Sequence, residues 1–215
     1  MFFKKLGFKD QSIQLIKPYV VQKKRGTFLF PFSHYKEFEI NSGEELTVDR
    51  RIRHSNDGLF LIEPVENNFK DSIYYFDSVL SMMCFYDCHN AILFENSLFV
   101  VIPLIPKFKP ITDLITSYNL AKTHTLVLPK TTTGICQEIL LTSSINNIEG
   151  FRIKKDEDTL LISGNNRFKK YHLDDFSLFN FKRDFNILRK PNRVVDKKPK
   201  NFSSYIEKHF FYENN

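Results

Sequence analysis

The sequence predicts an α/β fold, with a parallel-sheet core, an N-terminal β-rich extension and a basic C-terminal tail. Three short apolar runs in the middle of the chain, each followed by a segment with helical spacing, indicate the core. This alternation is typical of βαβ units and of a parallel sheet. A chain of 215 residues is long enough to bury a sizeable core. We divide it into an extension over 1–66, a core over 67–180 and a tail over 181–215.

The core elements follow one another in order between residues 73 and 153. Apolar runs of strand length alternate with segments of helical spacing, and Pro129 marks where the third run stops. We expect core strands over 73–77, 98–102, 124–128 and 150–153, and helices over 78–87, over 111–119 and after residues 131–134.

The segments on either side of the core have different patterns. The extension begins with a helical, amphipathic pattern that Pro18 ends, followed by strand-like runs separated by turn residues. These predict a helix over 1–22 and antiparallel strands over 27–32, 36–40 and 44–53. After the core, a strand is expected over 159–163, residues 172–188 are open between helix and loop, and the polar stretch after 189 predicts a linker or tail.

The net charge of +6 is concentrated near the C-terminal end. Residues 182–215 hold nine Lys or Arg and four Asp or Glu, a surplus of +5. A basic tail on a nearly neutral body indicates a polyanion partner such as nucleic acid. The alternative is a solvated end that only aids solubility.

Two motifs of the core resemble those of the Toprim family, the topoisomerase–primase fold, in particular primase-like proteins of bacterial plasmids and conjugative elements. Residues 73–84 (IYYFDSVLSMMC) are similar to the family's strand–acid–helix motif, and residues 125–134 (TLVLPKTTTG) have the shape of its D-x-D motif. Residues 56–60 (NDGLF) stand where the family's lead-in segment ends. The resemblance spans roughly residues 20–150 and implies a parallel sheet with its site at the carboxyl ends of the strands.

The chain departs from the family at the acidic positions. Active members use a Glu as general acid or base and hold Mg²⁺ with further acids; here the Glu position is Asp77 and the next acidic position is Ser81. Pro129 and Thr131 replace the two aspartates of the D-x-D motif, and Lys130 lies between them. Because Mg²⁺ is recruited by carboxylates, we expect a degenerate domain without a metal or cofactor and without Mg²⁺-assisted chemistry.

Binding is the function that these substitutions leave open. Lys130 and the hydroxyls beside it lie at the start of a predicted helix, where unpaired N–H groups and the helix dipole attract phosphate. The structural alternative is that a Thr N-cap and a Gly at the helix start need no ligand. Arg51 and Arg53 share one face of a predicted strand, either to contact phosphates or as solvated residues. The candidate nucleic-acid-binding residues are therefore Lys130, Thr131, Thr132, Arg51, Arg53, Lys182, Arg183, Arg189, Lys190, Arg193, Lys197 and Lys198.

The remaining clusters are interpreted mainly as parts of the fold. Cys84, Cys88 and His89 lack the fourth ligand of a structural zinc site. Phenylalanines 179, 181 and 185 lie among basic residues and are either core or stacking platforms for bases. Asp87 or Asp174 joining Asp77 would give a residual Mg²⁺-dependent nuclease or primase, which is one alternative function.

These observations lead to a functional expectation. We expect a non-catalytic protein that binds DNA or RNA, and the resemblance implies replication, mobilisation or defence of a mobile genetic element. The alternative from another class is a protein-interaction module that kept the Toprim scaffold. The absence of a signal peptide pattern and of a long apolar run predicts a cytoplasmic protein without a membrane partner.

Overall fold

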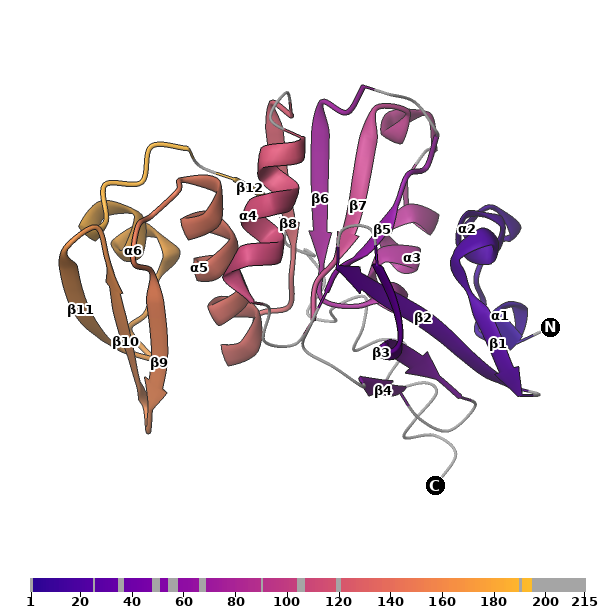
Figure 1. Ribbon diagram of the computed structural model, residues 1–215, viewed down its shortest axis with the longest axis horizontal. Helices are drawn as coiled ribbons and strands as arrows, with labels where there is room; N and C mark the ends of the chain where they lie inside the picture. The colour runs from indigo at the N-terminus through magenta and orange to yellow at the C-terminus, as the bar shows by residue number, and fades with distance from the viewer. Residues whose placement is uncertain are drawn as a thin grey trace.

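A computed structural model describes most of the chain (Figure 1). It covers residues 2–24, 26–34, 37–47, 51–53, 58–65, 69–89, 91–103, 107–118, 121–189 and 191–194. The protein is mixed α/β, as the sequence predicts, and the strands within these ranges form three sheets.

A five-stranded sheet forms the centre of the molecule, with strand order β12–β8–β6–β7–β5. Strands β6, β7, β8 and β12 are parallel, and β5 runs antiparallel to β7 at one edge. The three predicted strands are confirmed, and the first and third are direct parallel neighbours. The strands are β5 (Phe60–Ile62), β6 (Ser72–Phe76), β7 (Ser97–Val101), β8 (Thr123–Val127) and β12 (Asn192–Arg193).

Helices cover both faces of this sheet. One face packs on α3 and on the N-terminal elements through a phenylalanine-rich cluster that includes Phe76 and Phe99. The other face packs on α4 and α5 through residues such as Tyr75, Ile111 and Leu141. Burial on both faces explains why the strands are continuous apolar runs. The elements are α3 (Val79–Asp87), η2 (Ala91–Phe94), α4 (Phe108–Ser117) and α5 (Thr132–Ile145).

The N-terminal elements form a separate antiparallel sheet of order β1–β2–β3–β4 with short helices beside it. Phe3, Phe30 and Phe32 are buried in the cluster shared with α3. The carboxylate of Asp87 accepts hydrogen bonds from Ser12 Oγ and the backbone N–H of Lys9, which fixes α2 to the end of α3. The elements are α1 (Phe2–Lys5), α2 (Asp10–Ile16), η1 (Lys17–Tyr19), β1 (Val21–Lys24), β2 (Thr27–His34), β3 (Glu37–Leu46) and β4 (Arg51–Arg53).

A third unit, a small sheet with one helix, packs on the opposite side of α5 from the central sheet (Figure 1). Its strands are antiparallel in the order β11–β10–β9, and Asn165 and Asn166 both take positive φ in the turn between β10 and β11, as a tight hairpin requires. Its elements are β9 (Arg152–Asp156), β10 (Thr159–Gly164), β11 (Arg167–His172) and α6 (Leu178–Asp184).

Two predictions about the end of the chain are wrong. The strand expected over 150–153 as a core strand belongs to the small sheet, because four of the five residues of β9 are charged and exposed. The fourth parallel strand is instead β12, from the segment expected to be tail. Helix α6 spans the boundary expected between core and tail, within the stretch left open between helix and loop. Its Phe181 and, directly after it, Phe185 are buried core residues, whereas Phe179 is exposed. Within the described part of the chain no helix has the length and apolar character needed to span a membrane.

Candidate functional site

The two resemblance motifs meet at one edge of the central sheet. Strands β6 and β8 are parallel and in register at their ends, where Phe76 pairs with Val127. The residues that follow each strand, Asp77 on one side and 128–131 on the other, therefore lie at the same edge. Ligands of open α/β sheets bind at this edge, outside the carboxyl ends of the strands.

Asp77 is buried at this edge and precedes Ser78, the N-cap of α3. Its Oδ1 atom lies 3.4 Å from Ser78 Oγ, which donates to it. Ser78 also caps the helix, since its Oγ accepts a hydrogen bond from the backbone N–H of Ser81 at 3.1 Å. Ser81, at the second acidic position of the motif, is buried in the first turn of α3.

A second carboxylate, which sequence reasoning missed, reaches the same place from β3. Glu44 is fully buried, and its Oε2 accepts a hydrogen bond from Val79 N at 3.4 Å. Its Oε1 lies 3.7 Å from the Nε of Arg51 on β4. The positive end of α3 and a guanidinium thus both act on this charge. The sequence does contain a signal for this contact. Acids at 44–45 and arginines at 51 and 53 are separated by a few residues, and such opposite charges pair across neighbouring antiparallel strands.

The start of α5 is organised by its own side chains. Thr131 is the N-cap, and its Oγ1 accepts a hydrogen bond from the backbone N–H of Gly134 at 3.2 Å. Lys130 and Thr132 are exposed. A Cβ atom on Gly134 would lie 2.0 Å from the backbone carbonyl oxygen of Pro129, so glycine permits this tight turn. Thr131 and Gly134 therefore both have structural roles in the start of α5. Lys130 is the charged group that faces solvent here.

The Gly134→Ala substitution tests this turn. We expect it to lower the free energy of unfolding by about 1–3 kcal/mol, because the helix start must move away from Pro129. Chemical denaturation measures the change. Gly150→Ala is the matched control, because no atom lies within 4 Å of a Cβ atom built on Gly150. The φ of +61° at Gly150 is strained for alanine, so this control reports backbone strain without steric crowding. A stable Gly134→Ala protein with an unchanged denaturation midpoint would contradict the tight approach.

The acids considered for a residual metal site are not gathered around Asp77. Asp87 lies at the opposite end of α3, about 13 Å along a nine-residue helix, and is held by Ser12 and Lys9. Asp174 is exposed in the turn after β11, in the small unit beyond α5. Burial raises the pKa of the Cys84 thiol, which disfavours the thiolate that would bind metal. Among the described residues no group of three or more His, Cys, Asp or Glu is placed to hold a metal ion.

Arg193 is part of a partly buried ion pair. Its Nε lies 2.8 Å from Oε1 of Glu138 on α5, and the Glu138 side chain is 2% exposed. Burial raises the pKa of Glu138, and the positive charges of Arg193 and Lys182 act in the opposite direction. The pair connects β12 to α5, so this arginine has a structural role that the sequence did not indicate.

The remaining basic candidates are spread over the molecule. Arg183 is exposed on α6 and pairs with the neighbouring Asp184 at 3.0 Å. Arg189 exchanges backbone hydrogen bonds with the side chain of Asn146, at the C-terminal end of α5, about 20 Å along that helix from Lys130. The structure therefore does not bring these residues together. Lys182 is half-buried near Glu138, Arg53 lies on β4, and Lys190, Lys197 and Lys198 lie outside the described residues.

Comparison with known proteins assigns neither a family nor a function to this chain. No protein-family model, curated protein or solved structure matches this chain.

Proposed function

We propose that this chain is a non-catalytic nucleic-acid-binding protein built on a degenerate Toprim-like core. The observation that carries the proposal is the composition of the sheet edge after β6 and β8. One carboxylate there, that of Glu44, lies at the start of α3 with Arg51 beside it. The other, that of Asp77, is buried, and the charged group that faces solvent on the β8 side is Lys130.

This edge has the charge to meet a phosphate rather than a divalent cation. A site for Mg²⁺ needs carboxylates directed at the ion, and the two D-x-D positions are held by a proline and an N-cap threonine. Lys130 beside the first N–H groups of a 14-residue helix provides positive potential instead. The link to a mobile genetic element rests on the resemblance alone and is part of the proposal.

Fluorescence anisotropy with a labelled oligonucleotide tests the function. If three phosphates are neutralised, raising salt from about 50 to about 200 mM should weaken binding to a single strand roughly twentyfold. Lys130→Gln should weaken binding by several-fold at the lower salt and reduce the salt dependence.

Lys122→Gln is the matched control. Lys122 is also exposed and precedes the same strand, β8, at its opposite end, so its loss should leave affinity unchanged. Absence of binding to DNA and RNA at low salt would reject the proposed function. Equal effects of the two substitutions would reject the placement at the sheet edge.

A further inference from the structure

The small sheet beyond α5 has one face in the core and one face in solvent. Leu160 and Ile162 of β10 are fully buried, and they pack with Phe181 of α6, with Phe185 directly after that helix and with Ile139 of α5. Because successive side chains of a strand alternate between faces, Leu161 and Ser163 point to the opposite side. The register extends this assignment to the strands on either side.

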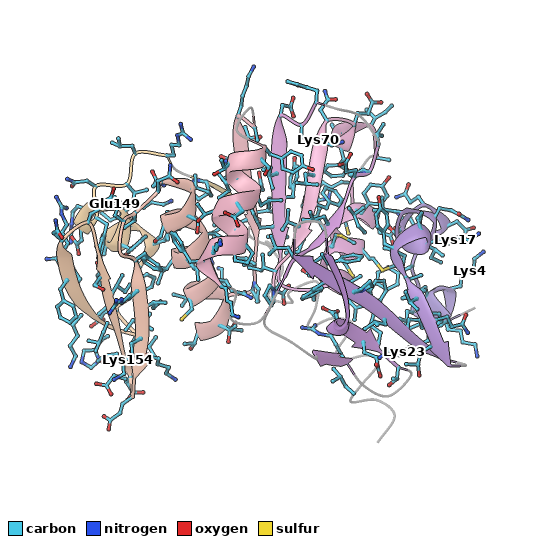
Figure 2. All side chains as sticks on the ribbon, in the orientation of Figure 1. Lys4, Lys17, Lys23, Lys70, Glu149 and Lys154 are labelled. Atoms are coloured by element: carbon cyan, nitrogen blue, oxygen red, sulfur yellow. The ribbon has the colours of Figure 1, made fainter. Side chains whose placement is uncertain are left out.

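The solvent face carries cations and an aromatic ring arranged around two central residues. Ser163 pairs with Arg152 on β9 and with Phe168 on β11, and Leu161 pairs with Lys154 and Lys170. We call this set the outer face: Arg152, Lys154, Leu161, Ser163, Phe168 and Lys170. Lys154 is labelled on this sheet in Figure 2, on the opposite side of the molecule from Lys4, Lys17 and Lys23.

The charged and aromatic groups of the outer face are available to a ligand. Arg152, Lys154 and Lys170 are exposed, and none of them forms an ion pair or side-chain hydrogen bond with another residue that the structure describes. Phe168 is 65% exposed and has no aromatic neighbour among the described residues. The packing of the unit does not account for the exposure of a large ring among unpaired cations.

Strand geometry fixes the dimensions of this arrangement. Residues two apart on a strand are separated by about 7 Å, and β9 and β11, on either side of β10, are about 10 Å apart. Arg152, Lys154, Lys170 and Phe168 therefore occupy the corners of a rectangle of about 7 by 10 Å, with Leu161 and Ser163 between them. By the same register this face continues to Asp156, Thr159 and His172, so the exposed carboxylate of Asp156 lies about 7 Å along β9 from Lys154, at one end of the rectangle.

We infer that the outer face binds single-stranded nucleic acid, with the three cations on phosphates and a base stacked on Phe168. This inference deepens the proposed function, on which it rests, by adding a second surface and a class of ligand. Cations that follow a backbone together with an exposed ring that accepts any base are the elements of single-strand binding. A duplex keeps its bases stacked inside and offers no base to the ring. An acidic protein would use the cations but not the aromatic ring.

Two pairs of lysines on the same strands provide the test. Lys154 and Lys170 point outward, whereas Lys155 and Lys169 pair in register with Leu160 and Ile162 and belong to the other face. All four are exposed. The full chain is titrated against labelled single strands of about 12 nucleotides, one of deoxythymidine and one of uridine, and against a duplex of equal length.

Replacing Lys154 and Lys170 with glutamine should weaken single-strand binding at least about tenfold at low salt and reduce the salt slope by about 1.4. The Lys155→Gln/Lys169→Gln protein should bind as the unmodified chain does. Phe168→Leu keeps an apolar side chain without the π face and should weaken binding about fivefold or more, whereas Phe168→Tyr should restore it. The two single strands show whether the sugar is also recognised.

Several results would overturn the inference. These are normal binding by the Lys154/Lys170 variant, equal losses in both lysine pairs, duplex binding as tight as single-strand binding, and equal competition by polyglutamate or by anionic vesicles. If Lys130→Gln weakens binding and the outer-face variants do not, this inference fails while the proposed function stands. If the unmodified chain binds no nucleic acid, both fail.

Discussion

Replacing Arg193 with alanine is expected to lower the free energy of unfolding by roughly 3 kcal/mol, because the carboxylate of Glu138 would stay buried without its partner. Burial already raises the pKa of Glu138, and loss of the guanidinium removes the larger of the two charges that oppose this rise. Chemical denaturation at neutral pH measures the change. The difference between variant and unmodified protein should shrink as the pH falls, since the folded variant can then protonate Glu138.

The Arg183→Ala substitution is the matched control for this prediction. Arg183 is another arginine of the same basic segment, but its side chain is 64% exposed and its partner is the adjacent Asp184. Exposed pairs of this kind contribute little, so a change within about 0.5 kcal/mol is expected. Equal and small effects of both substitutions would show that β12 is not fixed to α5 by this pair.

Acidification from pH 6.5 to 4 is expected to remove roughly 3 kcal/mol of stability through His124 alone. This residue lies in β8, buried, with Nδ1 3.0 Å from the hydroxyl of Tyr75 on β6. Burial, and secondarily the charge of Arg189, lowers the pKa of His124 from 6.5 to about 4. The unfolded chain therefore takes up the proton at higher pH than the folded chain does. The contribution is complete above pH 6.5 and is lost as the pH falls towards 4.

Denaturation midpoints of the unmodified protein and of His124→Gln, measured across this pH range, isolate the effect. Carboxylates that titrate in the same range contribute to both proteins, so the difference between the two curves reports His124. The variant should lose less stability on acidification. Parallel curves would contradict a neutral, buried imidazole in the folded state.

The central elements could be predicted because their sequences are compatible with few alternative structures. Strands β6, β7 and β8 are apolar runs buried on both faces, and the helices after β6 and β8 have recognisable starts, the Ser78 and Thr131 caps. The parallel arrangement of these strands was predicted from the alternation of strands and helices along the chain. The N-terminal hairpin was also predicted, but the break expected between strands over 36–40 and 44–53 is wrong, because β3 runs through it from Glu37 to Leu46 and the next strand, β4, begins at Arg51.

The misplaced strands show where local pattern is not enough. Strand β12 has two exposed polar residues and carries no signal of its own; it is part of the sheet because Val194 N and Leu126 O form a hydrogen bond beside it and Arg193 pairs with Glu138. In β9 a single apolar residue, Ile153, faces the core. A strand with one apolar and four charged residues is typical of a half-exposed sheet, so the expectation of a core strand over 150–153 rested on too little of the pattern.

The chemical groups of the site were harder to predict than the fold. Asp77, Lys130 and Thr131 could be placed at one edge because they follow strands of known order. Glu44 could not, because it reaches the edge from a different sheet, and the charge pattern that indicates an ion pair with the arginines of β4 does not distinguish Glu44 from Glu45. The outer face also required the register of three strands before residues 152, 154, 168 and 170 came together.

The affinity of the full chain for a labelled single strand, measured at matched ionic strength with EDTA or with Mg²⁺, tests the central claim most directly. We predict binding in EDTA at least as tight as in Mg²⁺, a steep loss with added salt, and an intact strand after prolonged incubation with either Mg²⁺ or Mn²⁺. Binding that requires the divalent ion, or cleavage that Asp77→Ala abolishes, would contradict it.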